Sequence, residues 1–178
     1  MTPPTEMLRD DHRLILRALD LLEAAADRLT GGDVLPAGWW AELVDWLRAF
    51  ADHAHHAKEE RVLFPAMLEA GLPSEGGPIA VMLEEHDRGR FLVREMEQEP
   101  PLVRLARARD YVREVREHIA KENGVLLPMA EVILDLDAQQ AVASGFERLA
   151  EGGAESIARA EARLDALTDV FLDGRVRA

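Results

Sequence analysis

Apolar residues recur at helical spacing over most of the chain. In the first such segment Leu8, Ile15 and Leu19 lie four or seven positions apart and therefore share one face of a helix. Four long segments show this pattern, and connections that contain Gly or Pro separate them. They span about residues 6–29, 36–70, 78–98 and 102–136. This arrangement predicts an all-α protein built on an up-down four-helix bundle.

Two prolines fall inside the second and fourth predicted helices. Pro65 has no N–H group to donate, and its ring clashes with the carbonyl group of Arg61 in a regular helix. Pro128 occupies the matching position in the fourth helix. We therefore expect both helices to be kinked near these residues.

The chain is predicted to be helical again beyond Ala138. Gly152 and Gly153 should divide this part into two helices. It contains no histidine, so we interpret it as a structural extension that packs on the bundle. The predicted organisation is a four-helix bundle over residues 1–136 and a C-terminal helical extension over residues 137–178.

Composition supports helices and excludes several kinds of site. Of the 178 residues, 48% are hydrophobic but only 5% are aromatic, which suits helices better than strands. The chain has no cysteine, so disulfides, iron–sulfur clusters, zinc–thiolate sites and cysteine nucleophiles are excluded. A formal net charge of −13 repels phosphates, so neither nucleic acid nor a membrane surface is expected as a partner.

The sequence carries no signal for export or membrane insertion. Residues 1–6 lack the basic and apolar regions of a signal peptide. No apolar run approaches the roughly 20 residues that a membrane-spanning helix needs. We therefore expect a soluble cytoplasmic protein.

A short motif occurs in both the second and the fourth predicted helix. Residues 55–65 read HHAKEERVLFP, and residues 118–128 read HIAKENGVLLP. In each copy a histidine precedes a glutamate by four positions, which puts both side chains on the same face of a helix. The pairs are His55 with Glu59 and His118 with Glu122.

The other two long helices each contain one histidine that follows an acid. Asp11-His12 in the first helix resembles Glu85-His86 in the third. If all four helices turn their marked residues inward, four imidazoles and two carboxylates meet in the core. The set is His12, His55, Glu59, His86, His118 and Glu122. It suits two iron or manganese ions, with both glutamates as bridges and open positions for oxide, water or a small ligand.

Other interpretations of these residues remain open. A single His-x-x-x-Glu pair is usually an exposed contact of roughly 0.2–0.5 kcal/mol, and a metal-free interaction protein would carry only such pairs. His56 and Glu60 are also four positions apart. The internal repeat selects His55 and Glu59 instead, and it leaves His53, His56 and Glu60 as flanking or supporting groups.

Two further residues have two interpretations each. Tyr111 lies two turns before His118, and we interpret it as a core residue whose hydroxyl group is hydrogen-bonded. The alternative is a gate or a redox-active neighbour of the metals. Arg90 follows His86 by one turn and either points outward or lines the mouth of the site.

As a set, these motifs resemble the hemerythrin-like, or HHE cation-binding, family. The resemblance covers roughly residues 6–136 and implies an up-down bundle around a non-haem diiron centre. Arg90 stands where oxygen-carrying hemerythrins have a second histidine in helix three. In the last helix of those proteins an aspartate follows the histidine by five positions, whereas here Glu122 follows His118 by four. The ligand set is similar instead to that of repair-of-iron-centres proteins, which are associated with nitric oxide stress.

The resemblance implies a non-haem diiron protein that binds or reduces small oxidants such as O₂, NO or H₂O₂ in oxidative or nitrosative stress response or sensing. The alternative is a non-enzymatic iron-binding or sensor module that acts through a partner. The expected cofactor is two iron ions, with Mn or Zn as alternatives. Expected partners are a small diatomic or peroxide ligand and an electron donor, and the chain would be a monomer or small homo-oligomer.

Overall fold

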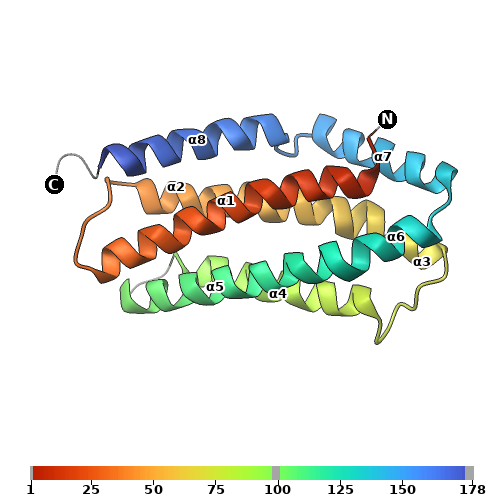
Figure 1. The fold of residues 1–178 in the computed structure, drawn as a ribbon, viewed down its shortest axis with the longest axis horizontal. Coiled ribbons are helices and arrows are strands. Elements are labelled where there is room, and N and C mark those ends of the chain that lie inside the picture. Colours follow the sequence, from red (N-terminus) through yellow and green to blue (C-terminus); the bar gives the residue numbers. More distant parts are fainter. Residues whose placement is uncertain (1, 98–100, 175–178) are drawn as a thin grey trace.

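Four long antiparallel helices form the bundle that the sequence predicts (Figure 1). The computed structural model describes residues 2–97 and 101–174, and every regular element in these ranges is a helix. Two of the long helices are composites that include π-helical stretches. The first long helix is α1 (Pro4–Thr30), and the third is α4 (Pro78–Glu95). The second consists of α2 (Trp39–Trp46), η1 (Leu47–His56), η2 (Glu59–Leu63) and α3 (Phe64–Glu69). The fourth consists of α5 (Pro101–Lys121), η3 (Glu122–Leu126) and α6 (Leu127–Ile133).

Some helix ends differ from the predicted ones for local reasons. The second helix begins at Trp39 because Gly38 before it has a φ of 78°, a backbone conformation that favours glycine. The fourth helix ends at Ile133, since Asp135 caps the next helix by accepting a hydrogen bond from the Ala138 amide. The predicted end of the third helix, Gln98, lies outside the described residues.

A π-helical turn precedes each of the two prolines at which a kink is predicted. The Phe64 amide bonds to the Glu59 carbonyl oxygen, five residues back, and the Leu127 amide bonds to that of Glu122 in the same way. A wider turn here makes room for the proline that follows, whose ring would otherwise clash with the preceding turn. Both π turns begin at a glutamate of the repeated motif.

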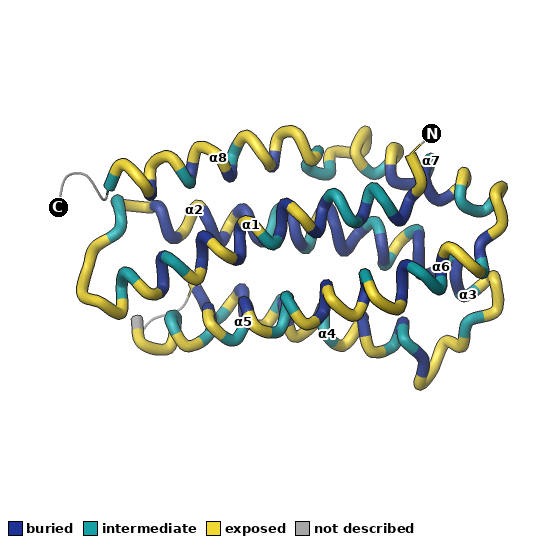
Figure 2. Tube along the Cα trace, viewed as in Figure 1, coloured by how far each residue is buried: buried dark blue, intermediate teal, exposed yellow. Residues whose placement is uncertain are grey.

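The buried interior consists of two apolar clusters with a polar layer between them. The larger cluster contains Trp46, Phe50 and Leu92, and the smaller one contains Leu63 and Phe146. Along the first three long helices, the buried histidines and glutamates fall between the residues of the two clusters, and in the fourth Glu122 does so. Buried positions face the interior of the bundle along its whole length (Figure 2). The two clusters therefore seal the polar layer at both ends.

The C-terminal extension packs along one side of the bundle (Figure 1). It consists of α7 (Leu136–Glu151) and α8 (Ile157–Asp173), and it contacts α1 and the second helix. The indole N–H groups of Trp39 and Trp46 donate hydrogen bonds of 2.8 Å to carbonyl oxygens of α8. The extension therefore contacts the bundle, and the division into two domains at residue 136 stays a prediction.

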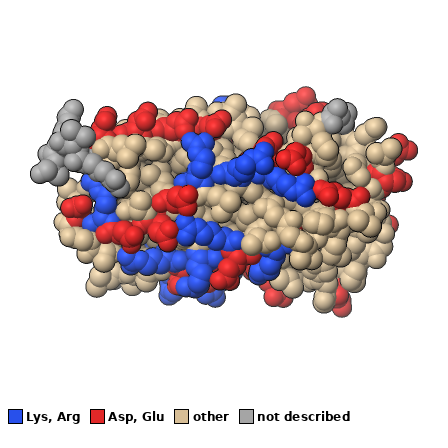
Figure 3. Space-filling model, in the orientation of Figure 1, with Lys and Arg blue, Asp and Glu red and all other residues tan. Residues whose placement is uncertain are grey.

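Surface charges alternate in sign over the helices. Figure 3 shows basic and acidic side chains interleaved on one face. Arg17 pairs with Asp165 at 2.6 Å, and Arg116 pairs with Asp20 at 2.7 Å, so ion pairs connect α1 to α8 and to α5. Each such exposed pair contributes at most about 1 kcal/mol. No helix among the described residues is long and apolar enough to cross a membrane.

Candidate metal centre

The bundle brings all six predicted residues together in its polar layer. None of these residues is more than 4% exposed. They come from all four long helices, since α1, α4 and the two composite helices each contribute. The residues are His12, His55, Glu59, His86, His118 and Glu122.

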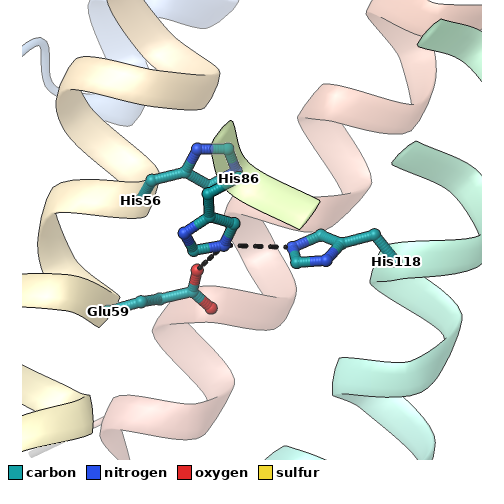
Figure 4. Close-up of side chains that lie close together, drawn as sticks. All are labelled: His56, Glu59, His86 and His118. Atoms are coloured by element: carbon teal, nitrogen blue, oxygen red, sulfur yellow. Dashed lines mark hydrogen bonds and ion pairs between the residues drawn. The ribbon is translucent and has the colours of Figure 1, made fainter. Parts of the chain in front are cut away.

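These side chains, together with His56, form two groups that share Glu59. One group is His12, His55, Glu59 and Glu122, and the other is His56, Glu59, His86 and His118. Within each group, one ligand atom from every residue lies within 4.8 Å of the others. Figure 4 shows the Glu59 carboxylate turned toward His86, which faces His118. Glu122 belongs to the first group but also contacts the second, because one of its oxygens lies 3.1 Å from Nε2 of His12 and the other lies 3.1 Å from Nε2 of His118.

The chemistry of the layer fits a bound cation. Both carboxylate oxygens of Glu59 and of Glu122, and the Nε2 atoms of His12 and His55, have no hydrogen-bond partner among the described residues. Some of these atoms lie close together, at 3.1–3.7 Å, but without the alignment of hydrogen bonds. Native proteins rarely leave buried polar atoms unpaired without a functional reason, and buried carboxylates are especially costly. Metal ions would pair them.

The two buried glutamates have opposite pKa shifts. Burial raises the pKa of Glu59 well above its usual range, and the charge of Glu122 adds to this effect. Burial alone would also raise the pKa of Glu122, but the imidazoles of His118 and His12 lower it well below its usual range. Burial lowers the pKa of His55 to about 4, which keeps this imidazole in the neutral form that binds metals.

The repeated motif also explains how two of the imidazoles are oriented. His55 Nδ1 lies 3.2 Å from a carboxylate oxygen of Asp11, and the Lys58 ammonium donates to the same oxygen at 2.5 Å. An imidazole that donates from Nδ1 presents the lone pair of Nε2 to a metal. Asp11 thus fixes the tautomer of His55, and Lys58 holds Asp11 in place.

The second copy repeats this arrangement with different residues. His118 Nδ1 lies 2.9 Å from Glu85, and Lys121 donates a hydrogen bond to the same carboxylate. In both copies the acid that precedes one histidine therefore supports the histidine of the following helix. The lysine three positions after the supported histidine neutralises that acid.

The symmetry between the two halves is broken at the remaining histidines. His86 Nδ1 lies 2.7 Å from a carboxylate oxygen of Glu60, whereas His12 Nδ1 lies 2.9 Å from the amide oxygen of Asn123. Glu60 and Asn123 occupy the same position in the two motif copies. One histidine therefore has a charged support and the other a neutral one, which makes the two candidate metal positions different.

Arg90 joins two supports on the charged side. Its guanidinium donates to Asp52 at 2.8 Å and to Glu60 at 2.6 Å. Asp52 lies 3.5 Å from Nδ1 of His56. Burial alone would raise the pKa of Asp52, but contacts with His56 and Arg90 lower it to about 2. Of its two predicted orientations, Arg90 adopts the one that faces the site.

Replacing Arg90 by Gln is expected to weaken metal binding at the position formed by His56, His86 and His118. The positive charge between Asp52 and Glu60 would be lost, and the imidazoles they support would be less firmly oriented. Loss of such supports lowers metal affinity roughly 10- to 100-fold. Metal titration followed by elemental analysis measures it. Arg88→Gln, on the exposed face of the same helix, is the control, and equal affinities in both variants would contradict the role of Arg90.

The sequence analysis assigned His56 to the flanking groups, but the structure places it in the second group. Its ring stacks on that of His86 with a centroid distance of 3.7 Å (Figure 4). His53 is 66% exposed and belongs to neither group. A signal for His56 exists in the sequence, since Asp52 precedes it by four positions.

Tyr111 is buried as expected, yet its hydroxyl group makes no hydrogen bond within the described part of the chain.

Comparison with known proteins identifies the bundle. Residues 4–130 match the family model described as the hemerythrin HHE cation binding domain. The chain is 36% identical over 135 residues to the iron-sulfur cluster repair protein YtfE of Yersinia pseudotuberculosis serotype O:1b (strain IP 31758). The same identity and length relate it to YtfE of Yersinia pestis (strain Pestoides F).

The match to these relatives is partial. It covers 68% of this chain but 60% of each relative. No solved structure gives a significant match. The family model, in contrast, spans well over half of the chain and includes all six predicted residues and His56. The chain therefore belongs to the hemerythrin HHE cation-binding family.

Proposed function

We propose that this chain is a non-haem diiron protein that binds small oxidants such as O₂, NO or H₂O₂. In the enzymatic form of this proposal, the protein also reduces them. The observation that carries the proposal is the pair of buried His/Glu groups that share Glu59. Five imidazoles and two carboxylates offer a mixed nitrogen and oxygen ligand set, which iron accepts. Mn and Zn are the alternative metals.

The protein residues have separate tasks in this proposal. His12, His55 and one oxygen of Glu122 would hold the first ion, and His56, His86 and His118 the second. Glu59 would bridge the two ions. Two iron ions would supply open coordination positions and an Fe(II)/Fe(III) couple. The apolar clusters on both sides of the layer pack against the imidazoles and would keep them fixed.

The names of the relatives support a role in stress response. The Yersinia proteins are named for iron-sulfur cluster repair, and this chain shares the bundle with them. We propose that it acts in oxidative or nitrosative stress in the cytoplasm, as a monomer or small homo-oligomer with an electron donor. Nucleic acid and membranes are not proposed as partners, because the net charge of −13 disfavours both.

Replacing His118 by Ala tests the proposed metal centre. The variant removes an imidazole of the second group and a contact of Glu122, so the iron content of purified protein is expected to fall from two ions toward one or none. Elemental analysis and the near-ultraviolet absorption of the loaded protein measure the loss. His53→Ala, which changes an exposed histidine, serves as the control. Unchanged iron stoichiometry in His118→Ala would refute the assignment.

A second candidate function is a non-enzymatic iron-handling or sensor module that acts through a partner. The repair role in the names of the relatives favours it. Metal loading would stabilise the bundle, and metal loss would loosen it. Rapid turnover of NO or H₂O₂ by the iron-loaded protein would support the first function. Iron transfer to an apo iron–sulfur protein without such turnover would support the second.

A further inference from the structure

Two small cavities meet beside the second group of candidate ligands. One has a volume of about 150 Å³ and the other about 160 Å³. His56 and Gly89 line both cavities. His86 and His118 line the first, while Tyr111 and Arg94 line the second. Both cavities therefore border the second group of candidate ligands, and Gly89 forms part of the wall of each.

Gly89 is an unusual residue for its position. It lies in the interior of α4, one turn after His86, where glycine destabilises a helix relative to alanine. It is buried, yet its backbone conformation is an ordinary helical one that does not require glycine. A Cβ atom built on it would approach only the Tyr111 ring, at 3.7 Å, an ordinary contact. What glycine provides here is empty space.

We propose that Gly89 keeps open the passage by which a ligand of two or three heavy atoms reaches the metal position of His56, His86 and His118. This inference rests on the proposed function, and it identifies the passage through which the ligand would enter the metal site. A side chain at position 89 would project into the space that the two cavities share. A helix former there would stabilise α4 but narrow the passage, so the glycine serves access at the expense of stability.

The second cavity has the chemistry to receive a polar or anionic ligand. Three arginines are among its lining residues. Arg48 and Arg90 are paired with carboxylates, whereas Arg94 forms no ion pair within the described ranges. Tyr111 is 3% exposed and its hydroxyl group has no hydrogen-bond partner there. Burial raises the pKa of Tyr111, and the charge of Asp52 adds to this effect, so its hydroxyl group remains a donor at neutral pH. Such donors suit anions of the azide or nitrite class.

Azide binding to the iron-loaded full-length protein tests the inference. Gly89→Ala is expected to slow azide association about tenfold in stopped-flow absorbance, with unchanged iron content and a raised melting temperature. Gly124→Ala, at a helical glycine with no atom within 4 Å of its missing Cβ, is the control and should keep the wild-type rate. Tyr111→Phe should speed azide dissociation. An unchanged association rate in Gly89→Ala would overturn the inference.

A metal-free measurement separates this inference from the proposed function. Bromide soaked into crystals of the metal-free protein is expected to give an anomalous peak in the second cavity, and a weaker peak in Tyr111→Phe. If wild-type protein holds no iron but bromide occupies the cavity, the diiron function fails while the anion cavity stands. If iron is present but bromide does not occupy the cavity and azide binds Gly89→Ala at the wild-type rate, the inference alone fails.

Discussion

Replacing Glu59 by Gln is expected to abolish stable binding of both metal ions. Glu59 is the only residue that belongs to both ligand groups among the described residues, and it is fully buried. The amide lacks the negative charge that offsets two cations in a low-dielectric interior. The loss of affinity should therefore exceed the roughly 10- to 100-fold that follows loss of a supporting hydrogen bond. Metal content after dialysis measures the effect.

The same substitution should leave the metal-free protein nearly as stable as the wild type. Burial and the charge of Glu122 raise the pKa of Glu59, which favours the neutral form of this side chain in the metal-free protein. A neutral amide of similar shape then changes little. Urea unfolding in the presence of a chelator measures this free energy of unfolding.

Glu60→Gln is the matched control for Glu59→Gln. Glu60 is adjacent in the sequence and partly exposed, and it supports His86 without belonging to either group. This variant should weaken only the second metal position. Equal metal loss in the two variants would show that Glu59 does not bridge the two ions.

Removal of metal from the wild-type protein is expected to cause the largest loss of stability. A ligand at a hundredfold excess over its Kd stabilises the folded state by about 2.7 kcal/mol, or about 5 kcal/mol for two independent ions. For a domain of this size the melting temperature should fall by roughly 10–20 °C. Calorimetry with Fe(II) under anaerobic conditions, and then with a chelator, measures the difference.

Glu59→Gln also controls the chelation experiment. Since this variant should not retain metal, its melting temperature should be the same with and without chelator. If the melting temperature of the wild-type protein were unchanged by either iron or chelator, the buried carboxylates would have to be stabilised in some other way.

The sequence predicted the bundle and most of the polar layer because the information is local and repeated. Helical spacing of apolar residues identified the four long helices, and the two motif copies selected His55 over His56 as the equivalent of His118. The structure then shows that Lys58 and Lys121, shared by both copies, hold the supporting acids. The repeated motif thus contains residues that position the candidate ligands as well as the candidate ligands themselves.

His56 was missed because the repeat and regular helix geometry both argue against it. The second copy has Ile119 at this position, and adjacent residues in an α-helix point in different directions. The structure places His56 at the end of a ten-residue π-helical stretch, in which each turn holds more residues. His55 and His56 can then both border the polar layer. Apolar spacing does not reveal such a stretch.

The sequence also could not predict the ion pairs between different helices that support the candidate ligands. Arg90 contacts Asp52 and Glu60, which lie 38 and 30 residues away in the chain. Nothing in the spacing of these residues specifies which cation meets which acid. Only the packing of α4 against the second helix brings them together.

Both ligand groups depend on the fourth helix, and this has a consequence for biosynthesis. One group needs Glu122 and the other needs His118, although the remaining ligands all lie within the first 86 residues. A ribosome must therefore release about two thirds of the polypeptide before either cation can be fully enclosed. Until then the nascent hairpin carries charged groups whose burial without a metal ion would cost free energy. Metal acquisition should therefore be a late event in maturation, coupled to closure of the second hairpin on the first.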